Sequence, residues 1–336
     1  MNLVTGATGH IGNVLVRELV SRGESVRALL LPSEDPAPLD GLDVEKVEGD
    51  VLHPETLEPA MRDVDVVYHL AGIVSIMPGM AGVLHRVNVV GTQNTLQASL
   101  EAGVRRFVYP SSIQAIAAPP EGSVIDETLP FDPSLAWGDY DKSKAQATLE
   151  VQKAVAQGLD AVIVCPTGVI GPYDYRLSEM GMFLLSCAGQ KPKVYVEGAY
   201  DFVDVRDVAQ GHILACQRGR TGESYILAGS RIAVRGLIGL VEEITGAVGP
   251  HLRIPIWLAQ FASRFAPLYY RLARAKPRFT PYSIHTITSN SVISQRKARR
   301  ELGYSSRPAK ETIVDTLRWF TERGVLAPAY VRLERR

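Results

Sequence analysis

The amino-terminal glycine loop constrains the fold of this chain more than any other stretch. The sequence opens with "MNLV", a strand-like run, continues with "TGATGHIG", and then reads "NVLVRELVSRG", a helical pattern that we expect to stop at Gly23. Gly6 permits a tight turn, Gly9 lets the backbone approach a pyrophosphate, and Gly12 lets the helix pack closely, with its N–H groups facing the anion. This order predicts a dinucleotide-binding loop, with an ordinary glycine-rich turn as the alternative.

Short apolar segments alternate with helix-length segments through the first half of the chain. The further strand-like segments are "SVRALLL", "DVEKVEGD", "VDVVYHLAG", "RRFVYPSS" and "DAVIVCP". Repeated strand–helix–strand units predict an α/β fold, a doubly wound parallel sheet of the Rossmann type. Beyond Gly171 the pattern becomes irregular. We therefore expect a dinucleotide-binding domain over 1–170, to which 202–230 returns, and a smaller C-terminal substrate-binding part over 171–201 and 231–336.

Composition and cysteine spacing indicate a cytoplasmic protein without a metal site. The 336 residues are 46% hydrophobic, which suffices for a large core. The three cysteines show no paired spacing, as is typical of thiols in a reducing compartment. We expect no signal peptide, because the first residues read as a strand, and no membrane span, because Arg264 and Pro267 interrupt the longest apolar stretch.

Charge is balanced overall but uneven along the chain. Residues 251–310 hold twelve Lys and Arg against one acid, Glu301. A solvated basic surface, an anionic substrate, or weak contact with an anionic membrane surface would each explain this excess. Nucleic acid is not expected, since no binding motif accompanies the charge. Within this region the apolar segment 254–275 fits a lid, an interfacial helix, or a helix packed on its own domain.

The segment "WGDYDKSKAQATLE" places Tyr140 and Lys144 four residues apart, so that on a helix they share one face. By itself this spacing fits a catalytic pair or two polar residues on a solvated helix. A phenol titrates near pH 10, so a useful base at neutral pH needs a fall of about three pH units, roughly 4 kcal/mol. Lys144, together with the positive charge of an oxidised nicotinamide, can supply that field.

Six motifs in order resemble the extended branch of the short-chain dehydrogenases/reductases, the NAD-dependent epimerase/dehydratase superfamily. The Gly-x-x-Gly-x-x-Gly spacing of the first loop is the form found in that branch. The six are "TGATGHIG", "GDV" at 49–51, "HLAG" at 69–72, "NVVGTQN" at 88–94, "YPSS" at 109–112 and "YDKSK" at 140–144. The resemblance covers nearly the whole chain. It also implies a homodimer, formed through the helices near 82–102 and 139–157.

The resemblance assigns roles to the polar residues of these motifs. It implies that Tyr140 is the general acid/base, that Lys144 assists it and holds the nicotinamide ribose, and that Ser112 holds the substrate oxygen. Ser111 is the alternative to Ser112. Asn88 matches a helix asparagine that supports the site in relatives, and a structural role for it is equally open.

The resemblance likewise implies cofactor contacts along the sheet edge. Asp50 and Val51 would meet the adenine, Ala71 and Gly72 would line the phosphates and ribose, and other residues would flank the nicotinamide. The complete set is Gly6, Thr8, Gly9, His10, Ile11, Gly12, Leu31, Asp50, Val51, Ala71, Gly72, Tyr140, Lys144, Pro166, Thr167 and Val169. Leu31 stands where NAD-preferring relatives carry an acid and several NADP-preferring relatives carry an arginine. Glu34 and Asp35 just beyond it favour NAD slightly over NADP.

Three signals bear on the reaction. The segment "SSIQAIA" lacks the acids of dehydratases, and "CPTGVIGPYD" lacks the asparagine usual in UDP-sugar 4-epimerases. Both segments resemble the branch of dihydroflavonol reductases, 3β-hydroxysteroid dehydrogenases and hopanoid-associated sugar epimerases. We therefore expect an NAD(P)-dependent oxidoreductase that interconverts a secondary alcohol and a ketone on a bulky or lipophilic small molecule. The alternatives are a sugar 4-epimerase that retains NAD and clasps a diphosphate with Arg176, Arg231 or Arg235, and a non-catalytic dinucleotide sensor.

Overall fold

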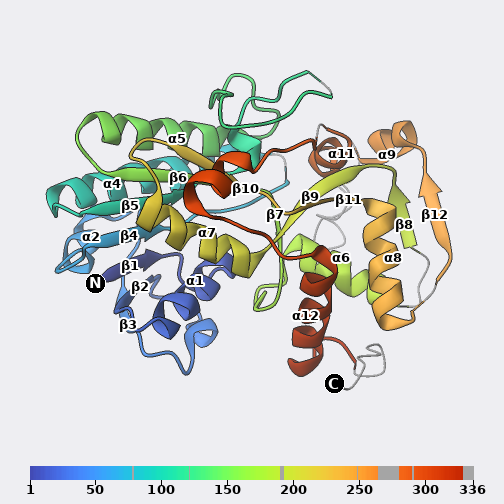
Figure 1. Cartoon of the computed structure of the whole chain (residues 1–336), viewed down its shortest axis with the longest axis horizontal. Coiled ribbons are helices and arrows are strands. Elements are labelled where there is room, and N and C mark those ends of the chain that lie inside the picture. The colour runs from blue at the N-terminus through green and yellow to red at the C-terminus, as the bar shows by residue number, and fades with distance from the viewer. Residues whose placement is uncertain are drawn as a thin grey trace.

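The computed structural model describes residues 1–77, 79–120, 122–189, 193–247, 249–263, 280–289 and 291–327 (Figure 1). Its centre is a seven-stranded parallel sheet with the strand order β10-β6-β5-β4-β1-β2-β3. The strands are β1 (Asn2–Thr5), β2 (Val26–Leu30), β3 (Glu45–Glu48), β4 (Val66–His69), β5 (Arg106–Pro110), β6 (Ala161–Pro166) and β10 (Ser224–Leu227). The α/β, doubly wound parallel fold predicted from the sequence is confirmed.

Helices cover both faces of this sheet (Figure 1). On one face α1 (His10–Ser21) packs against α7 (Val205–Arg218), and on the other lie α2 (Pro54–Ala60), α4 (Gly91–Glu101) and α5 (Asp139–Ala156). α3 (Ala81–Leu84) and a π-helical turn (His85–Val90) lead into α4. Neighbouring strand residues such as Leu3 and Val4 enter the two opposite cores, and both side chains are fully buried. Burial on both faces explains why the strands read as continuous apolar runs.

The strand order reverses beside β1, and this reversal locates the ligand crevice. β1 pairs with β2 on one side and with β4 on the other, and Thr5 is level with His69 at the carboxyl end of that second pair. Ligands of open parallel sheets bind outside the carboxyl ends of the strands at such a point. The glycine loop leaves β1 there.

A smaller assembly follows the sixth strand and lies to the right of the large sheet in Figure 1. It contains a three-stranded sheet of order β11-β9-β7 and a two-stranded sheet of β12 and β8. Its core includes Leu184, Leu237, Ile313 and Phe320. The strands are β7 (Gly168–Ile170), β8 (Lys193–Val196), β9 (Ala199–Asp204), β11 (Ser230–Ala233) and β12 (His251–Ile254). The helices are α6 (Glu179–Ala188), α8 (Val234–Thr245), α9 (Ile256–Ser263), α11 (Pro281–Thr288) and α12 (Ala309–Glu322).

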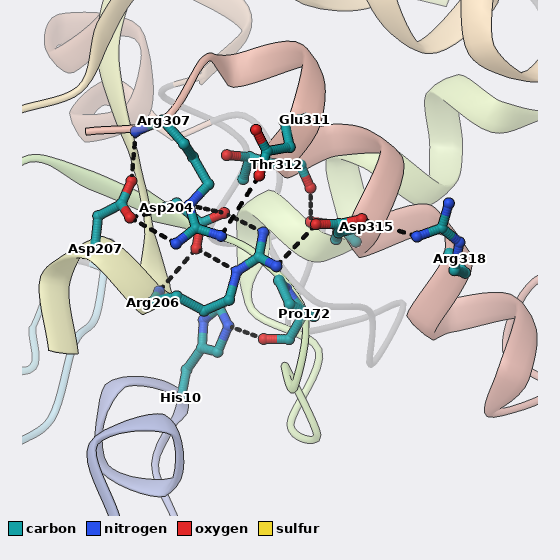
Figure 2. A network of polar contacts seen from close by, with 11 residues as sticks. His10, Pro172, Asp204, Arg206, Asp207, Arg307, Glu311, Thr312, Asp315 and Arg318 are labelled. Carbon is teal, nitrogen blue, oxygen red and sulfur yellow. Dashed lines mark hydrogen bonds and ion pairs between the residues drawn. The ribbon is translucent and has the colours of Figure 1, made fainter. Parts of the chain in front are cut away.

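An ion network ties the C-terminal helix to the start of α7 (Figure 2). The Asp204 side chain is fully buried and pairs with Arg206 at 2.7 Å, while Arg206 reaches Asp315 on α12 at 2.8 Å. Arg307 adds an ion pair to Asp207 at 2.8 Å. Burial alone would raise the pKa of Asp204, but hydrogen bonding and the charge of Arg206 hold that pKa below its usual value.

The apolar segment 254–275 falls only partly within the described residues, and Arg264, Arg271 and Arg274 lie outside them. Its described portion ends β12 and forms α9, which packs against α11. Across the part of the chain that the structure describes, none of the helices combines the length and apolar character needed to cross a bilayer. Cys165, Cys187 and Cys216 are free thiols.

Candidate active site

The glycine loop has the geometry that close approach of a ligand requires. Gly6 has a φ of +66°, and a Cβ added there would lie 2.6 Å from the Leu70 carbonyl carbon. A Cβ on Gly12 would overlap the carbonyl oxygen of Gly6. α1 begins after Gly9 without a side-chain cap, so the first-turn N–H groups are available to an anion.

The segment that follows β7 lies along the first turns of α1. The His10 ring bonds the Pro172 carbonyl at 3.0 Å, as Figure 2 shows, and Asn13 donates to the Tyr173 carbonyl at 3.2 Å. Arg17 donates to the Tyr175 hydroxyl at 3.2 Å. The Nε2 atom of His10 is therefore occupied by this segment.

Glu34 and Arg176 meet beside the glycine loop. The Thr8 hydroxyl donates to the Glu34 carboxylate and accepts from Arg176 at 2.8 Å, and Arg176 also pairs with Glu34. The chain turns back after β2, so that Glu34 also accepts the Leu31 N–H at 3.2 Å, whereas the Leu31 side chain is 44% exposed. The carboxylate thus occupies the place where an acid at the end of β2 would act. The contact with Arg176 had no signal in the sequence.

Ser112, Tyr140 and Lys144 converge at the carboxyl end of β5. Ser112 follows β5, and its hydroxyl accepts the Gln114 N–H at 3.2 Å and lies near the Tyr140 phenol. Burial raises the pKa of Tyr140 to about 12, although the bond from Ser112 acts to lower it. The Ser111 hydroxyl instead bonds Thr148 at 2.7 Å. The geometry therefore favours Ser112 over Ser111 as a partner of Tyr140.

Lys144 lies one turn further along α5, with its ammonium in the protein interior. Nζ donates to the Tyr109 hydroxyl at 2.9 Å and to the Pro110 carbonyl at 2.5 Å. Burial lowers the pKa of Lys144 to about 7. An ammonium has three N–H donors, so one donor remains for a further partner such as a ribose hydroxyl.

Asn88 lies in the π-helical turn before α4 and braces the segment at the end of β4. Its Oδ1 accepts the Ile73 N–H at 2.8 Å, and its Nδ2 donates to the Ile73 carbonyl at 3.0 Å and to the Ser143 hydroxyl at 3.0 Å. A Cβ on Gly72 would lie 3.2 Å from Oδ1. These contacts connect Asn88 to Ser143 on α5, three residues after Tyr140, and position Gly72.

A buried histidine beneath the glycine loop was not singled out by sequence reasoning. The Thr92 hydroxyl donates to the Asn88 carbonyl at 2.7 Å, so it accepts from His69 Nε2 at 3.0 Å. Nδ1 of the neutral ring therefore accepts from Thr5 Oγ1 at 2.9 Å, and Thr5 Oγ1 also accepts the Ala71 N–H at 3.0 Å. Burial and, secondarily, the charge of Lys144 lower the pKa of His69 to about 3, so the ring is neutral. The chain of bonds fixes Ala71 beside the loop.

The remaining predicted cofactor contacts lie at strand ends. The Asp50 carboxylate accepts the Leu52 N–H at 2.9 Å, and Val51 is buried against Gly91. Pro166 ends β6, and the Thr167 hydroxyl donates to Asp201 at 2.7 Å. Ile11 and Val169, also predicted contacts, pack against the core beneath the α1 face.

The three arginines considered for a diphosphate contact different parts of the molecule. Arg176 lies at the glycine loop, Arg231 donates to Ser291 at 2.8 Å, and Arg235 bonds the His251 ring. Several cations of the basic region 251–310 also have acidic partners. Arg253, Lys297, Arg300, Arg307 and Lys310 each form an ion pair. Much of the described basic charge is therefore neutralised within the chain.

Taken together, the arrangement combines an anion-binding helix start with a hydroxyl, a phenol and an ammonium at one sheet edge. The described residues hold no cluster of histidine, cysteine or carboxylate side chains that could bind a metal ion. Such a site can donate or accept a proton at an oxygen held by Ser112 and Tyr140.

Comparison with known proteins gives consistent results. The NAD dependent epimerase/dehydratase family matches residues 2–228. Sterol demethylase protein B of Methylococcus capsulatus is 39% identical over 328 residues, covering 96% of this chain and 99% of its own. A putative dihydroflavonol 4-reductase of Synechocystis is 34% identical, covering 96% and 94%. The crystal structure of gox2253 is 34% identical, covers 97% of this chain and 99% of its own, and superposes with a TM-score of 0.86.

Proposed function

The chain belongs to the NAD dependent epimerase/dehydratase family, the extended type of short-chain dehydrogenase/reductase, and from this premise we propose that it interconverts a secondary alcohol and a ketone. It is an NAD(P)-dependent enzyme of that type. The observation that carries the proposal is the contact of Ser112 with Tyr140 beside the buried ammonium of Lys144. The bound nicotinamide supplies or accepts the hydride.

The residues of this chain handle the proton and the substrate oxygen. Ser112 orients the oxygen, and Tyr140 donates a proton to it during reduction or removes the proton during oxidation. A phenol with a pKa of about 12 is fully protonated at neutral pH, so the cofactor-free site is prepared for donation. Lys144, one turn away, holds the nicotinamide ribose with its remaining donor and favours the phenolate when Tyr140 must act as a base.

We assign a bulky or lipophilic substrate to this site. Two relatives that match almost the whole chain carry the names sterol demethylase protein B and putative dihydroflavonol 4-reductase. The smaller assembly, which contains β7–β9, β11, β12 and the helices around them, would form the substrate-binding part. It begins directly after the carboxyl end of β6, and the carboxyl ends of the strands line the crevice (Figure 1).

The test is Tyr140→Phe, assayed with a panel of steroid and flavonoid ketones while NADH or NADPH oxidation is followed at 340 nm. Removal of the phenol hydroxyl should lower kcat at least about a hundredfold, the range of a general acid, with an unchanged Kd for the dinucleotide. Tyr225→Phe is the control for loss of a buried phenol hydroxyl, because Tyr225 is fully buried but lies on β10, where it bonds Glu301 at 3.2 Å. Retention of most activity by Tyr140→Phe would refute the mechanism.

For the cofactor we propose a preference for NAD, carried by Glu34. Its carboxylate lies beside Thr8 and Leu31, where it can accept from a ribose 2′-hydroxyl and would repel a 2′-phosphate. Arg176, paired with Glu34, is the group that would attract the phosphate if the carboxylate were neutral.

The second candidate is a sugar 4-epimerase with retained NAD, which the family membership itself supports. It would use the same Ser112, Tyr140 and Lys144 and consume no cofactor. Small molecules released by denaturing the purified protein separate the two readings. NAD or NADH close to one per chain favours the epimerase, whereas an empty protein that binds and consumes NAD(P)H favours the oxidoreductase.

Two further associations belong to the proposal. We expect a homodimer through the outer faces of α4 and α5, which light scattering would detect as twice the chain mass. We also expect weak contact of α9 with anionic lipid, because Trp257 is 69% and Phe261 58% exposed and the basic residues of 264–278 follow in sequence. Co-sedimentation with phosphatidylglycerol vesicles, but not with phosphatidylcholine vesicles, would support this contact.

A further inference from the structure

A helix of the smaller assembly lies directly on the first turn of the catalytic helix. α11 begins after Thr280, and its Tyr282 ring covers Gly138, where an added Cβ would lie 2.6 Å from two ring carbons. One turn later His285 stacks on Trp137, with ring centroids 4.2 Å apart and planes inclined by 7°. The start of α5 is therefore formed against residues about 140 positions further along the chain.

The polar contact of this junction joins Tyr282 to Asp141, the residue that follows Tyr140. The Tyr282 hydroxyl donates to the Asp141 carboxylate, which also accepts the Gly138 N–H at 3.2 Å and so caps the helix. Asp141 is only 3% exposed. A buried carboxylate with few hydrogen-bond donors depends on each of them, because the loss of one leaves part of its negative charge unpaired in the protein interior.

Three titratable groups face Asp141: Tyr140 on its own helix, Tyr282 from α11 and Tyr200 from β9. Tyr200 is held by Gln114, which donates to its hydroxyl at 2.7 Å. The negative charge of Asp141 raises the pKa of Tyr140 further, after the larger effect of burial. Asp141 therefore opposes ionisation of the Tyr140 phenol.

We propose that Asp141 and Tyr282 are positioning residues of this site, through which the docked α11 fixes the start of α5 and keeps a negative charge beside Tyr140. The inference rests on the proposed acid/base role of Tyr140. A negative neighbour opposes ionisation of the Tyr140 phenol. The charge of Asp141 therefore favours the protonated phenol, which is the form that donates the proton in reduction. The docking of the smaller assembly thereby acts on the chemistry as well as on substrate binding.

Two substitutions separate the charge from the hydrogen bond. Asp141→Asn removes the charge and keeps one oxygen, which can still accept from Tyr282, whereas the amide nitrogen takes the place of the oxygen that accepts the Gly138 N–H. Tyr282→Phe removes the donor and leaves the carboxylate in place. The double variant tests whether Tyr282 acts through Asp141, since coupled residues give non-additive effects. Tyr225→Phe, which loses a tyrosine–carboxylate bond on β10, is the matched control.

The experiment is a tyrosinate titration at 295 nm of the full chain saturated with NAD+, each protein being compared with its own Tyr140→Phe counterpart so that only Tyr140 is followed. We expect the midpoint to fall by about one pH unit in Asp141→Asn, as for removal of a nearby like charge. Tyr282→Phe should raise the midpoint of Tyr140, because the negative charge of Asp141 loses the hydrogen bond that partly offsets it. The same substitution should not shift the midpoint in the Asp141→Asn background.

Unchanged midpoints in Asp141→Asn and Tyr282→Phe, with or without a loss of stability, would overturn the inference, because a merely structural contact moves stability alone. An equal shift in Tyr225→Phe would overturn it as well. Other results would refute the proposed function instead, namely the absence of NAD+ binding or an active Tyr140→Phe variant. Where a ketone of the panel is turned over, Tyr282→Phe should lower kcat severalfold and leave KM within about twofold.

Discussion

Replacing Lys144 by methionine should make the cofactor-free protein more stable while removing its turnover. Lys144 is only 9% exposed, and burial lowers its pKa from 10.5 to about 7. The unfolded chain keeps the proton up to pH 10.5, whereas the folded protein releases it above about 7. Between these values the unfolded state binds more protons, so the free energy of unfolding rises with pH.

The magnitude follows from the same two values. One pH unit corresponds to about 1.4 kcal/mol, so the buried ammonium costs roughly 4 kcal/mol of stability at pH 7 and roughly 2 kcal/mol at pH 9. Methionine removes this cost but also removes the bonds to Tyr109 and Pro110, which we take as about 2 kcal/mol together. We expect Lys144→Met to gain about 2 kcal/mol at pH 7 and close to nothing at pH 9.

The assay is urea denaturation of the cofactor-free wild type and variant at pH 6, 7, 8 and 9. Lys193→Met is the matched control, since Lys193 is 5% exposed but its ammonium pairs with Glu242 at 2.8 Å. That control should destabilise the protein at every pH, because it removes the ion pair to Glu242 and the bond to the Ala247 carbonyl and leaves Glu242 with His251 as its partner. A stability difference between wild type and Lys144→Met that does not change with pH would refute the reasoning.

Gly12→Ala should abolish dinucleotide binding, measured by calorimetry, because the new methyl group overlaps the Gly6 carbonyl. As a control, Gly239→Ala on α8 places its methyl group in open space and should stabilise the protein by about 0.5–1 kcal/mol. Asp204→Asn should cost about 1.5–3 kcal/mol in urea denaturation, because Arg206 loses its bonds to the buried Asp204 carboxylate but keeps Asp315. The pKa of Asp204 is held below 3.8, so the ionised Asp204 stabilises the folded wild type above that pH, and this stabilisation should be lost as the pH falls further. The Asp204→Asn variant should not show this loss. Glu34→Gln should improve NADP affinity relative to NAD at least tenfold, about 1.4 kcal/mol, in fluorescence titrations; an unchanged ratio would contradict the role of Glu34.

Local patterns were sufficient for the parts of the site that lie within single elements. The glycine spacing predicted the turn after β1, because a tight turn and a close backbone approach permit few other residues. The four-residue spacing of Tyr140 and Lys144 predicted a shared helix face, and both lie near the start of α5. Ser112 was placed at the end of a buried strand, where the sheet brings it to Tyr140.

Contacts between distant segments were not predictable in the same way. Glu34 was noted from the sequence only as an acid beyond Leu31, whereas the structure shows that the turn after β2 brings its carboxylate back to the Leu31 N–H and that Arg176 reaches it from beyond β7. The role of His69 depends on partners 23 and 64 positions away. None of these contacts leaves a periodic signal in the chain.

The sequence by itself determined the succession of strands and helices in the first half, the glycine turn and the helix that carries Tyr140 and Lys144, because backbone sterics and burial act over a few residues. The tertiary structure alone decided which charges surround them. It buries the Lys144 ammonium beneath Tyr109, sets Asp141 under Tyr282, and pairs Glu34 with Arg176. The ionisation of each group depends on the desolvation and the charges that packing assembles around it, and those come from segments that local spacing does not connect.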